Sequence, residues 1–195
     1  MRRAVFLDRD GVVNRAVVRA GKPYPPASPA ELEILPGVAA GLHQLKAAGF
    51  DLIVVTNQPD VARGTQTREQ VEALHAALQA QLPIDEFRVC YHDDADHCGC
   101  RKPKPGLLLG AAYEHGIDLA ASYLIGDRWR DVAAGQAAGC MCLFIDYGYA
   151  ETQPAQPFVR SASSAEAVEW ILAQNGEQDL SRAQPHSCEV KDDAQ

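Results

Sequence analysis

The chain has 195 residues, of which 47% are hydrophobic and 23% are charged, and its formal net charge is -8. This length and composition suit one globular domain and exclude a fibrous or largely disordered chain. The acidic balance argues against nucleic acid or an anionic membrane as the main partner, because both attract cationic surfaces.

Short apolar runs alternate with helical patterns along most of the chain. Residues 3–7, 51–56, 88–91, 122–125 and 141–145 are expected to form strands. Helices are expected from Pro36-Gly37 to about Ala48, after a capping-box pattern at residues 67–70, from Pro105, and over residues 130–138. This alternation predicts an α/β fold with three layers, doubly wound around a mostly parallel sheet. Ligands of such folds bind beyond the carboxyl ends of the strands.

Two segments do not follow the alternation. Residues 15–35 contain four prolines and are too irregular for a helix, so we expect them to border the ligand pocket. Residues 163–174 predict a short amphipathic helix, after which the chain becomes polar and loses its periodicity. We therefore assign residues 1–175 to a single domain and residues 176–195 to a mobile polar tail.

Targeting signals are not evident in the sequence. No run approaches the roughly 18 apolar residues of a membrane span, and Met1 leads directly into a strand instead of a signal-peptide apolar region. We expect a cytoplasmic protein that does not bind membranes.

The first expected strand ends in two carboxylates, Asp8 and Asp10, which can face the same side of the sheet. On its own, such a pair is most often a solvated turn. If a cation relieves their repulsion from a phosphate group, one carboxylate can attack phosphorus while the other protonates the leaving oxygen. The pair therefore suggests phosphoryl chemistry.

Further polar residues follow the later strands. Thr56 ends the second strand, and its hydroxyl can hold a phosphoryl oxygen. Arg101 and Lys102 precede a helix and offer cations for a phosphate, although a basic run alone is usually a solvated surface. Asp127 and Asp131 follow the fourth strand and offer carboxylates for a metal ion, although Asp131 alone suits the first turn of a helix.

The order of these motifs resembles the haloacid dehalogenase superfamily. The similarity is greatest to its histidinol-phosphate and heptose-bisphosphate phosphatase branch and covers residues 5–149, with the sharpest matches at residues 6–14 and 100–103. The resemblance implies a Rossmann-like fold without a large cap domain and a phosphatase acting on a small phosphorylated metabolite.

The resemblance also implies roles for individual residues. Asp8 would be the nucleophile that forms an aspartyl-phosphate, and Asp10 the general acid and then the general base. Thr56 and Lys102 would hold the phosphoryl group.

A magnesium site is implied in the same way. The ion would be held by the carboxylates of Asp8 and Asp127 and the backbone carbonyl of Asp10, with Asp131 orienting this shell. An all-oxygen ligand set suits this hard cation.

Three cysteines and a histidine lie close together in the sequence. Cys90, His92, Cys98 and Cys100 provide a full tetrahedral set for Zn²⁺, and a closed set favours a structural role in pinning a loop. The similar phosphatases carry the same Cys-x-His and Cys-x-Cys pairs. Unligated thiols are the alternative, and His97 could in principle replace one ligand.

The sequence leaves the substrate open between two members of the branch. Residues 59–64 and 101–106 favour D-glycero-D-manno-heptose 1,7-bisphosphate, with removal of the 7-phosphate. The short stretch between His92 and Cys98 favours histidinol phosphate instead, and Arg128 replaces a lysine that is common in the heptose enzymes. Arg63, Arg101, Lys104 and Arg128 could recognise a second phosphate, which does not react. Asn57 and Lys102 are also expected to bind the substrate.

Two other functions are considered. A non-catalytic, zinc-stabilised binding module would be expected to have lost a carboxylate or the lysine, yet Asp8, Asp10 and Lys102 are all present. A phosphoryl transferase generally needs a cap to exclude water, and residues 15–35 are too few for one. We therefore expect a phosphatase, and we expect it to be a monomer.

Overall fold

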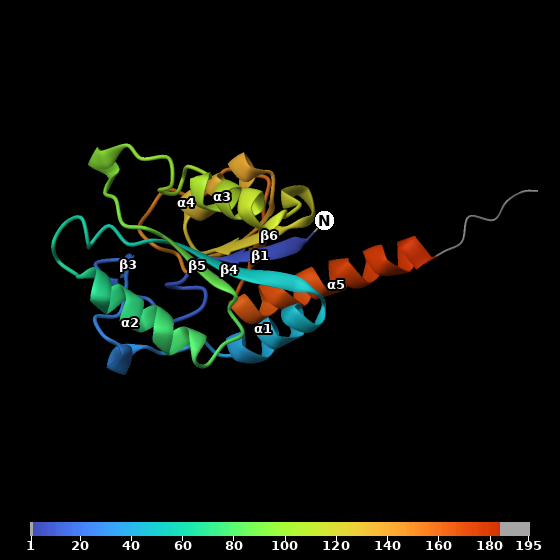
Figure 1. The fold of residues 1–195 in the computed structure, drawn as a ribbon, viewed down its shortest axis with the longest axis horizontal. Helices are drawn as coiled ribbons and strands as arrows, with labels where there is room; N and C mark the ends of the chain where they lie inside the picture. The colour runs from blue at the N-terminus through green and yellow to red at the C-terminus, as the bar shows by residue number, and fades with distance from the viewer. Residues whose placement is uncertain (1, 184–195) are drawn as a thin grey trace, which may run out of the picture.

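The computed structural model describes residues 2–183 and shows an α/β fold with a central sheet (Figure 1). Six parallel strands form the sheet in the order β5-β4-β1-β6-β7-β8. They are β1 (Arg3–Leu7), β4 (Phe50–Asn57), β5 (Glu86–Cys90), β6 (Tyr123–Gly126), β7 (Met141–Ile145) and β8 (Val159–Ser161). The first five confirm the predicted strands, whereas β8 was missed because three residues are too few to show a pattern.

Helices cover both faces of the sheet, which confirms the three layers. On one face lie α1 (Val38–Ala47), α2 (Arg68–Gln79) and α5 (Ser164–Ala183), and on the other lie α3 (Gly106–His115) and α4 (Trp129–Ala138) (Figure 1). The capping box predicted before α2 is present. The Thr67 hydroxyl accepts from the Gln70 amide at 3.2 Å, and the Gln70 side chain accepts from the Thr67 amide at 2.8 Å.

The two cores on either side of the sheet follow from the alternation of strand side chains. In β1, Val5 and Leu7 belong to the core beneath α1 and α5, while Ala4 and Phe6 belong to the core beneath α3 and α4. Successive strand residues point to opposite faces, so a sheet covered on both faces needs strands that are apolar throughout. The apolar run at residues 4–7 therefore fixes β1 in the middle of the sheet.

The proline-rich excursion contains a small hairpin instead of a cap domain. Its strands are β2 (Val17–Arg19) and β3 (Lys22–Tyr24), which pair antiparallel, and a single turn of 3-10 helix follows at Pro29–Glu31. Over residues 2–183 the prediction of no large cap is confirmed.

The last predicted helix is longer than expected. Helix α5 begins at Ser164 and continues past Gly176 to Ala183, so the first part of the predicted tail is helical. The rest of that predicted tail, residues 184–195, lies outside the described residues. Over the described part of the chain, no helix combines the length and the apolar character that a membrane span requires.

Candidate active site

The strand register brings the predicted site residues to one edge of the sheet. Leu7 pairs with Val54 on one side and with Ile125 on the other, and the amide of Asp8 donates to the carbonyl of Ile125 at 2.9 Å. Because all these strands are parallel, their carboxyl ends meet at the same edge. Asp8 and Asp127, which are far apart in the sequence, therefore become neighbours.

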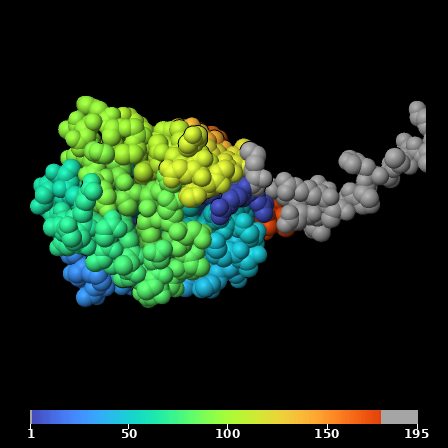
Figure 2. Space-filling view, in the orientation of Figure 1, coloured from blue at the N-terminus to red at the C-terminus, as the bar shows by residue number. Residues whose placement is uncertain are grey.

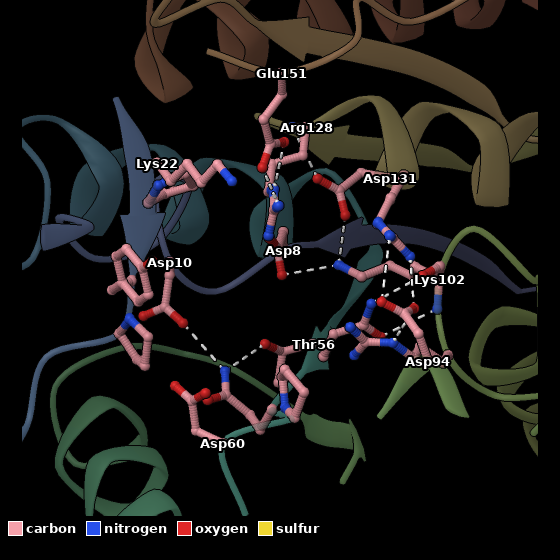
Figure 3. Close-up of a pocket in the computed structure, with 18 of the residues that line it drawn as sticks. Asp8, Asp10, Lys22, Thr56, Asp60, Asp94, Lys102, Arg128, Asp131 and Glu151 are labelled. Carbon is pink, nitrogen blue, oxygen red and sulfur yellow. Dashed lines mark hydrogen bonds and ion pairs between the residues drawn. The ribbon is translucent and has the colours of Figure 1, made fainter. Parts of the chain in front are cut away.

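Lys102 lies between two of the carboxylates (Figure 3). Its ammonium is 2.8 Å from Asp8 Oδ1 and 2.6 Å from Asp131 Oδ1, and it donates to the carbonyl of Val55 at 2.8 Å. The side chain is only 2% exposed. Burial alone would lower the pKa of Lys102, but the attraction of Asp131 and Asp8 outweighs it and raises this pKa. Lys102 is thus a buried residue whose charged form is favoured, and its ammonium lies beside Asp8 at the carboxyl end of β1.

The carboxylates of Asp8, Asp127 and Asp131 converge so closely that one lysine does not balance them. Their nearest oxygens all lie within 4.8 Å of one another. Burial raises the pKa of Asp8 to about 6 against the pull of Lys102, and burial together with Asp8 and Asp131 raises the pKa of Asp127 well above its usual range.

The surroundings of Asp127 fit a bound cation. Both of its carboxylate oxygens are buried and lack a hydrogen-bond partner, although the nearby Tyr149 hydroxyl favours the charged form. Buried carboxylate oxygens without partners are costly, and a hard cation with oxygen ligands removes that cost. The carboxylates of Asp8 and Asp127, with Asp131 beside them, suit Mg²⁺, which prefers carboxylate and water oxygens.

Gly11 is required where the chain leaves this carboxylate group. Its φ is +89°, and a Cβ atom at this position would lie 1.9 Å from Oδ2 of Asp127. Any other residue would therefore be strained in its backbone and would collide with Asp127. The glycine of the Asp-x-Asp-Gly motif is explained by this close approach.

Asp10 is held away from Lys102 by its own set of donors. Arg9, which is fully buried, pairs with Asp10 Oδ2 at 2.8 Å, and the side-chain amides of Asn14 and Gln58 donate to Asp10 at 3.0 and 3.1 Å. Burial raises the pKa of Asp10, but the charge of Arg9 and the three hydrogen-bonding side chains together bring it below its usual value. These three partners were not predicted, although Arg9 and Asn14 lie within the motif that was recognised.

Thr56 and Asn57 end β4 beside these groups. The Thr56 hydroxyl oxygen accepts from Gln58 at 2.9 Å, so its own proton remains available for a ligand. Asn57 donates to the backbone carbonyl of Lys102 at 3.0 Å and accepts from its amide at 3.1 Å. Asn57 therefore fixes the backbone of Lys102, and the substrate contact predicted for it stays a prediction.

A cavity of about 370 Å³ opens above Asp8, Asp10 and Lys102 (Figure 3). Residues of the proline-rich excursion line one side of it, as predicted. Its charged lining is balanced, with six cations and six carboxylates. The cations are Lys22, Arg63, Arg101, Lys102, Arg128 and Arg130, and the carboxylates are Asp8, Asp10, Asp60, Asp94, Asp131 and Glu151.

Three arginines of the cavity are tied to the segment that follows β5. Arg63 pairs with Asp93 at 2.7 Å, Arg101 pairs with Asp94 at 2.8 Å, and Arg130 pairs with Asp94 at 3.0 Å. Arg130 was not predicted as a site residue. Arg130 reaches the cavity because α4 and the loop after β5 meet in the folded protein, where it pairs with Asp94, and the sequence does not show that these two segments meet.

Arg128 and Lys104 differ in their relation to the cavity. Arg128 lines it and pairs with Glu151. The ammonium of Lys104 instead donates to the carbonyls of His97 and Cys98 at 2.8 and 2.7 Å, and Lys104 is not among the residues that line the cavity. The suggestion that Lys104 meets a second phosphate is therefore wrong, because its charge is directed to the cysteine-containing loop.

The predicted zinc ligands lie together where β5 passes into that loop, with Cys90 as the last residue of β5. The sulfurs of Cys90, Cys98 and Cys100 and Nδ1 of His92 are separated by 3.2 to 3.7 Å in five pairs. Tetrahedral Zn–S bonds of about 2.3 Å place sulfurs about 3.8 Å apart, so the group suits a zinc ion. Burial raises the pKa of Cys90, which a cation would counteract. His97 does not belong to this group.

Comparison with known proteins agrees with this geometry. The HAD-hydrolase-like family model matches residues 99–168. The D-glycero-beta-D-manno-heptose-1,7-bisphosphate 7-phosphatase of Rhodopseudomonas palustris is 39% identical over 150 residues, which cover 71% of this chain and 80% of that protein. The D-glycero-alpha-D-manno-heptose-1,7-bisphosphate 7-phosphatase of Mycobacterium bovis is 38% identical over 161 residues, covering 76% of this chain and 80% of that protein.

A solved structure is similar over almost its whole length. The D,D-heptose 1,7-bisphosphate phosphatase of B. bronchiseptica, complexed with magnesium and phosphate, superposes with a TM-score of 0.77 at 29% identity. The match covers 88% of this chain and 99% of that one. With its Asp-x-Asp-Gly strand end, buried lysine and capless sheet, this chain is a phosphatase that belongs to the haloacid dehalogenase-like hydrolases, in the branch of the D-glycero-D-manno-heptose-1,7-bisphosphate 7-phosphatases.

Proposed function

We propose that the protein removes the 7-phosphate from D-glycero-D-manno-heptose 1,7-bisphosphate through an aspartyl-phosphate on Asp8. The observation that carries this proposal is the buried contact of Lys102 with Asp8 and Asp131 at the carboxyl end of β1. A cation beside a nucleophilic carboxylate neutralises the phosphate that approaches it. The names of the similar proteins supply the choice of sugar.

In the first half of the reaction, an oxygen of Asp8 forms a bond to phosphorus as the bond to the sugar oxygen breaks. Asp10 gives its proton to that leaving oxygen. Lys102 and the free proton of Thr56 bind the phosphoryl oxygens and hold the group in line for attack. The products of this half are heptose 1-phosphate, which has a free hydroxyl group at position 7, and phosphorylated Asp8.

In the second half, Asp10 takes a proton from water and the water oxygen bonds to phosphorus. The bond between Asp8 and phosphorus breaks, which releases phosphate and restores the Asp8 carboxylate. The lowered pKa of Asp10 keeps its carboxylate ionised, so that it is free to accept this proton. In the first half, the negative phosphate that arrives beside Asp10 raises its pKa, because a like charge disfavours the ionised form. The substrate itself thereby helps to protonate Asp10 when a proton donor is needed.

A magnesium ion would be held by Asp8 and Asp127, with the backbone carbonyl of Asp10, and Asp131 would orient this set. When bound, it neutralises charge on the phosphoryl oxygens and on the carboxylates. The close group of three buried carboxylates and the unpartnered oxygens of Asp127 support this assignment.

Magnesium stabilisation is expected to depend on pH. The pKa of Asp8 is raised to about 6, so in the metal-free protein the folded state binds a proton more strongly than the unfolded state. The stability from this group is therefore present at low pH and is lost as the pH rises through about 6. Mg²⁺ replaces that proton, so its apparent affinity should rise about tenfold between pH 5 and pH 7.

Thermal unfolding with and without Mg²⁺ at pH 5, 6, 7 and 8 tests this expectation. The increase in melting temperature on adding Mg²⁺ should be larger at pH 8 than at pH 5, and Asp127→Asn should reduce it at both. An equal increase at every pH would contradict the assignment of these carboxylates to the metal.

We also propose a structural zinc ion bound by Cys90, His92, Cys98 and Cys100. No ligand position would remain open for a reaction. The loop carries Asp93, which pairs with an arginine of the cavity, and Figure 2 shows this loop, in lime green, beside the teal segment that contains Arg63. Fixing the loop would therefore also fix the arginine side of the cavity.

Substitution of Cys98 with Ala is expected to remove the zinc. The remaining three ligands would bind it far more weakly, so stoichiometric zinc in the wild-type protein should fall to a trace, as measured by elemental analysis after dialysis. Cys140→Ala removes a buried thiol outside the cluster and should leave the zinc content unchanged. Full zinc content in the Cys98 variant would refute the assignment.

Histidinol phosphate is the second candidate substrate, favoured by the short stretch between His92 and Cys98. Phosphate release from both heptose 1,7-bisphosphate anomers and from histidinol phosphate, each with Mg²⁺, decides between them. We expect a preference for a heptose anomer, because cations line the cavity beyond those at Asp8. Faster hydrolysis of histidinol phosphate would instead show that loop length identifies the substrate better than residues 59–64.

A further inference from the structure

The hairpin of β2 and β3 is fixed at the rim of the cavity. Its two turn residues, Ala20 and Gly21, both have positive φ values of 49° and 73°, the conformation of a tight two-residue hairpin turn. The carbonyl of Gly21 accepts a hydrogen bond from the amide of Ala150 at 2.9 Å. The tip is therefore attached to the segment after β7, which carries Glu151 into the cavity.

Lys22 is the first residue after this turn and lines the cavity. Figure 3 shows its side chain extending from the hairpin toward the middle of the cavity, where Asp8 and Arg128 lie. A positive φ is unfavourable for alanine, so the backbone is strained at Ala20. This turn sets the direction in which the side chain of Lys22 leaves the hairpin.

Lys22 differs from the other cations of the cavity because no carboxylate of the described residues pairs with it. Within residues 2–176, whose side chains the structure describes, Lys22 makes no ion pair or side-chain hydrogen bond. Each remaining cation of the cavity has a carboxylate partner at 3.0 Å or less. The pairs are Arg63–Asp93, Arg101–Asp94, Lys102–Asp8, Arg128–Glu151 and Arg130–Asp94.

A substrate with two phosphates needs a second positive site, because one phosphate occupies Asp8 and Lys102. The paired arginines can still donate hydrogen bonds, but their charges are largely offset by aspartates and a glutamate. Lys22 offers the uncompensated charge, and it comes from the opposite side of the cavity to the zinc loop. An anionic group that reaches the hairpin would meet an attraction that no carboxylate of the protein already uses.

We propose that Lys22 is a specificity-determining residue that binds the phosphate which is not transferred. This inference rests on the proposed function and extends it, because it names the residue that separates a sugar bisphosphate from the corresponding monophosphate. Lys22, on the hairpin, would then perform part of the substrate selection that a cap domain would otherwise provide.

The test compares Lys22→Gln with the wild-type protein on heptose 1,7-bisphosphate and on the heptose 7-phosphate that lacks the second phosphate. We expect kcat/KM for the bisphosphate to fall about tenfold, mainly through KM, as for the loss of one partly exposed charge-assisted hydrogen bond. The value for the monophosphate should stay within about twofold of wild type. Lys22→Arg should restore most of the preference, since it keeps the charge.

Lys46→Gln is the control, because Lys46 is a partly exposed lysine outside the cavity that pairs with Asp85. It should change neither value, which excludes an effect of net charge alone. An equal loss on both substrates would overturn the inference, because it would mean that Lys22 acts on the sugar or on the shape of the hairpin. An unchanged preference for the bisphosphate in Lys22→Gln would overturn it as well.

The proposed function is tested separately by the wild-type protein. If it hydrolyses the bisphosphate no better than the monophosphate, the proposed substrate fails before any variant is measured. If it does prefer the bisphosphate and Lys22→Gln keeps that preference, the inference about Lys22 fails alone. Inhibition by the product heptose 1-phosphate gives a second readout, and the Lys22→Gln variant should need about tenfold more of it.

Discussion

Replacing Asp8 with Asn is expected to lower kcat by about four orders of magnitude or more on every phosphate ester. The amide has no nucleophilic oxygen comparable with a carboxylate, so the aspartyl-phosphate cannot form. Phosphate release at saturating substrate and Mg²⁺ measures the loss. Acid quenching should trap a phosphorylated protein from the wild type and none from the variant.

The loss should not come from unfolding. The pKa of Asp8 is raised to about 6, so its ionised form is disfavoured in the metal-free folded protein, and a neutral side chain removes this cost at pH 8. The melting temperature of Asp8→Asn without Mg²⁺ should therefore be no lower than that of the wild type.

Asp60→Asn is the matched control for Asp8→Asn. Asp60 also lines the cavity, but it pairs with Arg63 at 3.4 Å and is not a partner of Lys102. This variant should keep kcat within a few-fold of wild type. More than about 1% of wild-type kcat in Asp8→Asn would mean that another group attacks phosphorus.

The central part of this site could be predicted because parallel strands present their carboxyl ends at one edge. Once residues 3–7, 51–56 and 122–125 are taken as parallel strands of one sheet, Asp8, Thr56 and Asp127 come to the same edge of it. The resemblance to the phosphatase branch then supplied the grouping of these residues into one site, which the strand ends alone do not determine. The cysteine cluster was predictable because its four residues lie within eleven consecutive positions, from Cys90 at the end of β5 to Cys100 in the loop that follows.

The walls of the cavity could not be predicted in the same way. The hairpin that carries Lys22 consists of two three-residue strands around two turn residues, and such short strands have no sequence periodicity. The pairing of Arg63 with Asp93 joins two loops that meet only after the sheet has formed. Charged loop residues have many possible partners, and the tertiary structure alone selects one.

Asn57 shows that a position at a strand end does not by itself reveal everything a residue does. Its place at the end of β4 predicts contact with the substrate, and this stays a prediction. The structure adds a second role, because the side chain of Asn57 donates to the carbonyl of Lys102 and accepts from its amide. A residue at a strand end can serve the reaction by positioning a neighbour 45 residues away in the sequence. The strand end predicts that Asn57 is near the site, whereas the role depends on where the loop with Lys102 returns.

Substitution of Lys102 with Met is the second large effect that we expect. It should lower kcat by about three orders of magnitude, because the phosphoryl group loses a preorganised cation at hydrogen-bond distance from the nucleophile. It should also destabilise the metal-free protein by about 3–5 kcal/mol at pH 8, since Asp8 and Asp131 would remain buried without their partner. Activity assays and thermal unfolding, each with and without Mg²⁺, measure the two effects.

Mg²⁺ separates the catalytic role of Lys102 from its structural role. A divalent cation beside Asp8 can offset the buried negative charge, so saturating Mg²⁺ should recover much of the lost stability of Lys102→Met but little of its kcat. Lys104→Met removes the same charge two residues away, where the ammonium binds loop carbonyls outside the cavity, and it should leave kcat within about threefold of wild type. If Lys102→Met kept near wild-type kcat with Mg²⁺ bound, Lys102 would be a structural counter-ion for the carboxylates and the phosphoryl group would have to be held by Thr56 and the backbone alone.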